Sequence, residues 1–423
     1  MLKANNPALN SWIAVPSGSD FPIQNIPFGV FKTVEKSPRV ATIIGDTVID
    51  LAELAKAGYF SDLDVDTAVF SQSYINDFMA LGKKAARAVR DRISDLFEKN
   101  NTELVGNTQV LANVLHNQKE VELLLPVRVG DYTDFYSSRE HATNVGTMFR
   151  DPDNALLPNW LHLPVGYHGR ASSIVVSGTE IHRPKGQQRP DDSQPPVFGP
   201  CKLLDFELEM AFIIGQPTKM GESISTAEAD DYIFGLALFN DWSARDIQKW
   251  EYIPLGPFLA KSFASTVSPW IVTLDALEPF RTEGYEQDPA VLPYLEYEGQ
   301  KNYDIKLEVA IQPEAGAAKV VCNSNFKHMY WTMTQQLAHH TVNGCNVNVG
   351  DMCASGTISG PTPDSFGSML EISWRGSKPV EMPDGSQRRF VNDGDTIVMK
   401  GWGEVNGLRI GFGECTGKVL PAL

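Results

Sequence analysis

The stretch Leu204-Asp205-Phe206-Glu207-Leu208-Glu209-Met210-Ala211-Phe212 alternates between two kinds of side chain. Positions 204, 206, 208, 210 and 212 are apolar, while positions 205, 207 and 209 are acidic. Successive side chains on a β-strand point to opposite faces, so this alternation predicts a strand with one strongly apolar face. A strand of that kind belongs to a core rather than to a solvated loop. The segment therefore predicts a β-rich domain built around it.

Glu207 and Glu209 project side by side from the predicted strand, so both can contact one ion. Like charges held near a core are unfavourable unless a cation or an arginine compensates them. A Glu-x-Glu pair on an exposed sheet face is, by itself, more often only a polar surface. The pair therefore leaves two interpretations open, a solvated face or a site with a positive partner, for which a bound hard cation is the simplest.

A second segment favours the functional interpretation. Residues 233–239 form a nearly continuous apolar run, which is typical of a buried strand. The run leads into Asn240-Asp241-Trp242-Ser243-Ala244-Arg245-Asp246-Ile247-Gln248, and polar residues at the end of a buried strand are placed like site residues. The candidate ligands are all oxygen atoms, and the sequence has no His-x-x-x-His and no clustered cysteines. The site therefore favours Mg²⁺ or Ca²⁺ over zinc.

The composition is that of a globular protein with room for two domains. The chain has 423 residues, of which 42% are hydrophobic and 21% are charged. Its net charge of -16 argues against nucleic acid as a partner and offers no basic patch to a membrane. No stretch has the pattern of a signal peptide or a spanning helix. Five cysteines without metal-ligand spacing predict reduced thiols in a cytoplasmic protein.

Residues 1–124 are predicted to form an N-terminal domain. Two short strands flank Gly45-Asp46, a plausible two-residue hairpin turn. Apolar residues recur at helical spacing over 75–97, and the lysines and arginines on the other face predict a solvated surface. The segment 101–121 is expected to be irregular.

Residues 125–423 are predicted to form a mostly β domain with a few helices. Short strands separated by turns are expected at 172–176, 203–214, 232–239, 269–274, 305–311, 370–374, 396–399 and 407–413. The best helix candidate is 326–337. The proline-rich stretch 183–200 is expected to be a long loop.

His141 closes a run that is dense in functional side chains, Gly130-Asp131-Tyr132-Thr133-Asp134-Phe135-Tyr136-Ser137-Ser138-Arg139-Glu140-His141. Taken alone, a histidine in this position is more often a helix cap or a core residue than a catalytic group. The run itself, however, resembles the fumarylacetoacetase family. Further matching runs are 159–170, Leu208-Glu209-Met210, 240–246, 250–252, 254–259, 354–360 and 366–371. The resemblance extends from about Asp20 to Leu423 and is thin between about 55 and 125.

The resemblance implies a small SH3-like β-barrel domain followed by a large β-sandwich roll. It implies a homodimer that hydrolyses a carbon–carbon bond of fumarylacetoacetate, giving fumarate and acetoacetate in the last step of tyrosine and phenylalanine catabolism. In that reaction a bound Ca²⁺ or Mg²⁺ polarises the diketone.

The resemblance also implies roles for particular residues. A pair formed by His141 and Glu371 activates water, and Arg245, Gln248 and Lys261 stabilise the carbanion that leaves. The implied metal ligands are Asp134, Glu207, Glu209 and Asp241, with Lys261 and Ser265 contributing around Asp241. The implied substrate contacts are Tyr136, Arg150, Tyr167, Gln248, Tyr252 and Thr357.

The sequence departs from the family pattern at three positions near Lys261. Ser265 replaces a threonine and keeps the hydroxyl, while Ala260 and Ala264 stand where glycine is more usual. None of these changes removes a charge. Two alternatives stay open at this point: a related acylpyruvate hydrolase or decarboxylase of the same fold, and a non-catalytic β protein that a cation stabilises.

Overall fold

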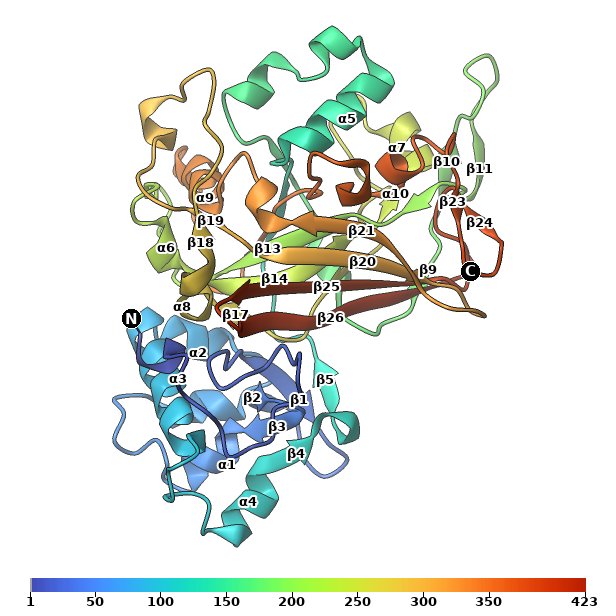
Figure 1. Ribbon diagram of the computed structural model, residues 1–423. Helices are drawn as coiled ribbons and strands as arrows, with labels where there is room; N and C mark the ends of the chain where they lie inside the picture. The colour runs from blue at the N-terminus through green and yellow to red at the C-terminus, as the bar shows by residue number, and fades with distance from the viewer. Residues whose placement is uncertain (1) are drawn as a thin grey trace.

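The computed structural model describes residues 2–423, which form a smaller N-terminal lobe and a larger lobe (Figure 1). Strands dominate the larger lobe, and short helices lie around them, which confirms the predicted mostly β, α+β class. Within the described residues, no helix combines the length and the apolar character needed to cross a membrane. The division of the chain near residue 124 stays a prediction.

An antiparallel sheet in the order β4-β3-β2-β1-β5 organises the N-terminal lobe. Its strands are β1 (Gly29–Lys32), β2 (Arg39–Ile44), β3 (Thr47–Asp50), β4 (Leu115–Asn117) and β5 (Glu122–Leu124). Ile44 pairs with Thr47, so Gly45 and Asp46 form the predicted two-residue turn. Gly45 adopts φ +58, a left-handed conformation that favours glycine. Closure of this sheet into an SH3-like barrel stays a prediction.

The N-terminal helices differ from their predictions in two respects. They are α1 (Leu51–Lys56), α2 (Asn76–Ala80), α3 (Lys83–Phe97) and α4 (Thr108–Val114). The single helix expected over 75–97 is two helices, because Gly82 at φ +89 ends the first helical run. The segment 101–121 is not irregular throughout: the Asn107 side chain caps α4, and Val114 packs into the core of the lobe.

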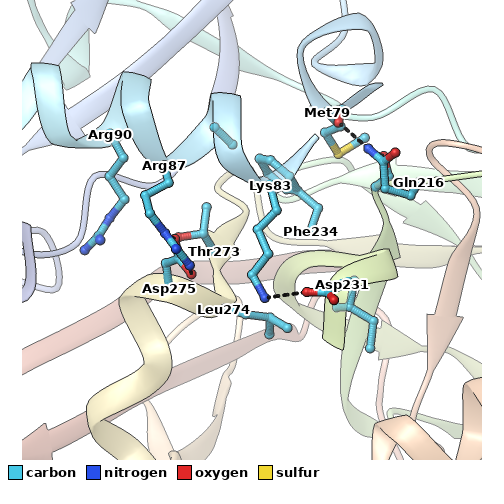
Figure 2. Close-up of a pocket in the computed structure, with 13 residues that line it drawn as sticks. Met79, Lys83, Arg87, Arg90, Gln216, Asp231, Phe234, Thr273, Leu274 and Asp275 are labelled. Carbon is cyan, nitrogen blue, oxygen red and sulfur yellow. Dashed lines mark hydrogen bonds and ion pairs between the residues drawn. The ribbon is translucent and has the colours of Figure 1, made fainter. Parts of the chain in front are cut away.

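The basic face of α3 was predicted to be a solvated surface, and this prediction is wrong. Arg90 is only 1% exposed, and its guanidinium donates to Asn5 Oδ1 at 2.7 Å. Arg87 donates to both carboxylate oxygens of Asp275, at 2.6 and 2.8 Å. Figure 2 shows Lys83 and Arg87 reaching from α3 to acidic residues of the larger lobe. Helical periodicity identified the polar face, but it carried no information about a lobe that covers that face.

Two large sheets form the body of the larger lobe. The first has the order β7-β6-β22-β13-β14-β16-β8, with β17 also paired to β14, and the second has the order β21-β20-β25-β26-β9. The strands of the first are β6 (Tyr132–Phe135), β7 (Gly166–His168), β8 (Ile174–Val176), β13 (Leu208–Ile214), β14 (Ile233–Asp241), β16 (Ser265–Val267), β17 (Val272–Thr273) and β22 (Met352–Ala354). Those of the second are β9 (Ile181–His182), β20 (Lys306–Gln312), β21 (Lys319–Asn325), β25 (Thr396–Val405) and β26 (Leu408–Leu420).

The two sheets pack face to face, with β14 against β25 and β26. The stretch 204–214 is buried at every position, so both sets of alternating side chains lie in the interior. Gly417 on β26 shows how closely the sheets approach. A Cβ atom added there would lie 2.7 Å from the Trp242 ring, so only glycine fits without a shift. The strand predicted over 203–214 is interrupted at Phe206 and Glu207: Leu204–Asp205 pairs with Ser243–Ala244 in a separate small sheet, and only β13 continues into the large sheet beside β14.

Three predicted elements of the larger lobe are corrected. The loop expected over 183–200 contains a hairpin of β10 (Lys185–Gln188) and β11 (Val197–Pro200). The helix expected at 326–337 is a short turn followed by α9 (Met333–Thr341), which Thr332 and Gln335 cap reciprocally. The strand expected at 370–374 is instead the helical turn α10 (Met369–Ile372).

Candidate active site

The four predicted metal ligands converge in the interior of the larger lobe. Asp134 lies on β6, Glu209 on β13 and Asp241 at the end of β14, while Glu207 precedes β13 and bridges to Ser368. Each offers a carboxylate oxygen, and these four atoms all lie within 4.8 Å of one another. All four residues are buried. Sheet pairing therefore brings together carboxylates that lie more than one hundred positions apart in sequence.

A lysine balances part of this negative charge. Lys261 Nζ donates to Glu207 Oε2 and to Asp241 Oδ2, both at 2.6 Å. Asp241 also accepts from Ser265 Oγ at 3.0 Å and from the Tyr167 hydroxyl at 2.9 Å. Burial would raise the pKa of Glu207, but Lys261 and Arg245 outweigh burial and lower it to about 2. Glu207 is therefore ionised at neutral pH.

Asp134 and Glu209 lack such compensation. Asp134 Oδ1 and Glu209 Oε1 are buried and have no hydrogen-bond partner among residues 2–423. Burial, followed by the charge of Asp241, raises the pKa of Asp134, and burial followed by the charge of Asp134 raises that of Glu209. Unpaired buried carboxylate oxygens are costly, and a hard cation with oxygen ligands would satisfy them. The donor set therefore fits a divalent metal ion.

Arg245 connects this cluster to the next part of the site. It begins α7 (Arg245–Glu251) and contacts Glu207 Oε1 at 2.7 Å and Asp205 Oδ2 at 2.8 Å. Its Nη2 atom is buried without a hydrogen-bond partner among the described residues. Asp205 also accepts from the backbone N–H groups of Met369 and Leu370 at the start of α10. Asp205 therefore fixes Arg245 and supports the helical turn that carries Glu371.

His141 and Glu371 form a buried pair. His141 Nδ1 lies 2.6 Å from Glu371 Oε2, although the two residues are 230 positions apart. His141 lies in the first turn of α5 (Arg139–Phe149), which Ser138 caps, and Ser368 caps α10 in the same way. Burial alone would raise the pKa of Glu371, but His141 and further donors outweigh burial and lower it. An ionised Glu371 accepts a hydrogen bond from Nδ1–H, which keeps the proton on Nδ1 and leaves Nε2 as the ring nitrogen that can act on water.

The remaining residues that were predicted for the site differ in burial and in how closely they contact His141 or the carboxylates. The Tyr136 ring packs edge-on against the His141 ring, with centroids 5.2 Å apart. Gln248 lies one turn after Arg245 on α7, and Tyr252 follows that helix and is 47% exposed. Thr357 is buried, and its hydroxyl has no hydrogen-bond partner among residues 2–423. Arg150 follows α5 and donates to the Ala155 carbonyl, and no contact joins it to the carboxylates. The roles of these residues stay predictions.

Several polar residues of the site were missed by sequence reasoning. Asn144, Ser359 and Ser368 all donate to the Glu371 carboxylate. Asn144 was detectable in principle, because it lies three positions after His141 and therefore on the same face of α5. Ser359 and Ser368 carried no comparable signal. The fold alone brings them to Glu371.

Comparison with known proteins agrees with this geometry. The family model described as "Fumarylacetoacetate (FAA) hydrolase C-terminal" matches residues 131–420, and "Fumarylacetoacetase N-terminal" matches residues 24–126. Fumarylacetoacetase of Homo sapiens is 54% identical over 415 residues, covering 98% of this chain and 99% of that protein. Fumarylacetoacetase of Dictyostelium discoideum is 54% identical over 420 residues, covering 98% of each.

A solved structure supports the fold at much lower sequence identity. Fumarylacetoacetate hydrolase from Exiguobacterium antarcticum is 17% identical, with a TM-score of 0.52, covering 94% of this chain and 99% of that chain. The likeness at this identity concerns the fold alone.

Proposed function

The chain belongs to the fumarylacetoacetase family, and we propose that it hydrolyses fumarylacetoacetate at the site formed by the His141–Glu371 pair and the carboxylate cluster. It is a hydrolase, and the products are fumarate and acetoacetate. One observation carries the assignment of the site: a buried histidine–carboxylate pair, at 2.6 Å, shares the interior with four convergent carboxylates. Neither group alone would distinguish an active site from a structural network.

The cation would be held by Asp134, Glu207, Glu209 and Asp241, with Lys261 and Ser265 orienting Asp241. The oxygen-only ligand set favours Ca²⁺ or Mg²⁺. When bound, a divalent ion supplies Lewis acidity to a chelating diketone. The unpaired oxygens of Asp134 and Glu209 support this assignment.

His141 acts as the general base. Glu371 holds the ring through Nδ1, so Nε2 removes a proton from the attacking water. The carbonyl carbon gains the hydroxyl group, the adjacent carbon–carbon bond breaks, and the leaving carbon takes the electron pair as an enolate. The protonated His141 then supplies the proton that this carbon needs. A histidine in contact with an ionised carboxylate suits both transfers.

The enolate charge is stabilised by donors that lie next to the cluster, where Arg245 and Lys261 both contact Glu207. The Nη2 nitrogen of Arg245 is buried and has no hydrogen-bond acceptor among the described residues. It can therefore donate to the negative charge that develops on the substrate. Lys261 and Gln248 complete this group. The substrate is held by Tyr136, Arg150, Tyr167, Gln248, Tyr252 and Thr357. Arg150 suits a substrate carboxylate, because its planar guanidinium can bind both oxygens.

The protein acts as a cytoplasmic homodimer. Tyr252, Ile253, Leu255 and Phe258 follow α7 directly, and Ile253 and Leu255 are 69% and 96% exposed. An exposed apolar segment beside the active site is typical of a surface that a second copy covers. Five free cysteines agree with a reducing compartment.

A spectrophotometric assay for loss of fumarylacetoacetate tests the function directly. The protein, supplied with Mg²⁺ or Ca²⁺, should consume fumarylacetoacetate much faster than acylpyruvates. The matched control is His141→Gln, which keeps a polar side chain of similar size but lacks the base. Equal turnover by that variant, or preference for acylpyruvates, would contradict the proposal.

A further inference from the structure

We propose that Asn144 and Ser359 are positioning residues that fix the Glu371 carboxylate and thereby hold His141 in the tautomer that can act as a base. This inference rests on the proposed function, because it assigns the two residues a role in that reaction. Neither residue belongs to the carboxylate cluster or to the group around Arg245. Both act through Glu371.

The contacts to Glu371 engage both of its oxygens. Oε2 lies 2.6 Å from His141 Nδ1 and accepts from Ser368 Oγ at 2.8 Å. Oε1 accepts from Asn144 Nδ2 at 2.9 Å, and Ser359 Oγ lies 2.9 Å from Oε1 and 3.0 Å from Oε2. A carboxylate held at one oxygen can still rotate. One held at both oxygens from different directions cannot rotate without breaking bonds to a buried charge.

Asn144 and His141 approach Glu371 from a single helix. They lie three positions apart on α5, so their side chains project from the same face. His141 contacts one carboxylate oxygen, and Asn144 contacts the other. The helix therefore presents two fixed donors to a planar acceptor, which sets the angle between the carboxylate and the imidazole ring.

Ser359 ties the start of α5 to the residues before α10. Ser138, the N-cap of α5, accepts from the His141 backbone N–H at 3.2 Å and donates to the Ser359 carbonyl at 3.0 Å. The Ser359 hydroxyl in turn accepts from the Gly367 N–H at 2.9 Å. Ser359 is completely buried. It therefore joins the backbone that carries His141 to the backbone that carries Glu371.

The consequence concerns the proton on the neutral imidazole ring. A fixed, ionised Glu371 keeps that proton on Nδ1 and leaves Nε2 free to accept a proton from water. If the carboxylate rotates, the proton can move to Nε2, and that ring nitrogen loses its basic lone pair. Among the described residues only Asn144 and Ser359 donate to Oε1, so removing either one weakens the hold on that oxygen. Each change should therefore reduce the fraction of rings in the active tautomer.

The test combines kinetics with histidine NMR. Asn144→Ala should lower kcat about 10- to 100-fold, the usual cost of removing an outer hydrogen-bond partner, and leave KM and cation affinity unchanged. Ser359→Ala should act in the same direction, and Ser359→Thr, which keeps the hydroxyl, should recover activity. Thr143→Ala is the matched control, because Thr143 lies on a different face of the same helix. In protein labelled with ¹⁵N-histidine, the signal that His141→Gln removes should shift toward the Nε2-protonated form in both alanine variants.

An unchanged kcat and an unchanged His141 signal in Asn144→Ala would overturn the inference. A raised KM with an unchanged signal would also overturn it, because Asn144 would then contact substrate directly. If Ser359→Ala does not fold, Asn144→Ala decides alone. Lack of turnover by the unaltered protein would contradict the proposed function instead, and the histidine spectrum would still decide whether the two residues fix the tautomer.

Discussion

Glu371 and the Asp134–Glu209 pair are buried carboxylates of the same lobe, but the protein compensates their charges differently. Glu371 has donors on both oxygens, and its pKa is lowered despite burial, with His141 as the largest opposing influence. Asp134 and Glu209 each keep an oxygen without a partner among residues 2–423, and burial raises both pKa values. The chain completes one site from its own side chains and leaves in the other the unpaired oxygens that suit a divalent cation.

Removal of the cation should have the largest effect, because the carboxylate cluster depends on a component from outside. Chelation should abolish turnover of fumarylacetoacetate, and added Mg²⁺ or Ca²⁺ should restore it. Glu207→Gln should keep the fold and weaken cation binding, as measured by circular dichroism and elemental analysis. Full activity in protein that elemental analysis shows to be metal-free would refute the assignment.

Disruption of the His141–Glu371 pair should have the next largest effect. His141→Ala should lower kcat roughly 10²- to 10⁴-fold, the usual contribution of general acid–base catalysis. Glu371→Gln should lower kcat as well, and the double variant should lose far less than the product of the two single losses. His182→Ala, at an exposed histidine, is the control. Multiplicative losses with fold and metal content intact would show that the two residues act independently.

Arg150 tests where the site ends, because within residues 2–423 its guanidinium donates hydrogen bonds to the Ala155 carbonyl alone. If it binds a substrate carboxylate, Arg150→Ala should raise KM about 10- to 100-fold, the cost of a charged hydrogen bond of about 1.5–3 kcal/mol. Cation affinity should not change. Arg39→Lys, in the N-terminal lobe, controls for general effects of altering an arginine. An unchanged KM would remove Arg150 from the site.

The pH dependence of stability should show the smallest of these effects. Its sign should differ between the Asp134–Glu209 pair and Glu371. In the folded, metal-free protein the pKa values of Asp134 and Glu209 are raised above those in the unfolded chain, which are about 4. The metal-free protein should therefore lose stability as pH rises from about 4 toward these raised pKa values. The lowered pKa of Glu371 acts in the opposite direction, because its contribution is lost as pH falls below the unfolded value. Thermal unfolding with and without Mg²⁺ should therefore show a stabilisation by the cation that grows with pH. A stabilisation independent of pH would contradict this.

The sequence predicted the strands that carry the carboxylate cluster better than it predicted the surroundings of Glu371. The apolar run before Asp241 predicted a buried strand that ends at an acidic residue, and β14 confirms it. The alternating stretch 204–212 predicted a buried strand, which β13 confirms from Leu208 onward. The need for positive charge near Glu207 and Glu209 also followed from charge and burial alone. Lys261 and Arg245 supply part of that charge, which a pattern of carboxylates could not show.

The region around Glu371 depends on contacts between residues that lie far apart in the sequence. His141 and Glu371 were paired through resemblance, since no local pattern links residues 230 positions apart. The segment around Glu371 was predicted to be a strand over 370–374. Its helical conformation depends on Asp205, a residue far away in the chain that accepts from the first N–H groups of α10. Tertiary contacts therefore decided the local structure.

Cation binding by two single variants tests the central comparison most directly. Equilibrium dialysis against Mg²⁺ or Ca²⁺, followed by elemental analysis, should be run on the unaltered protein, Glu209→Gln and Glu371→Gln. The unaltered protein and Glu371→Gln should retain the cation with similar affinity, whereas Glu209→Gln should bind it at least about 10-fold more weakly, because a ligand charge is lost. Equal cation binding by both variants, or no cation in the unaltered protein, would contradict the account.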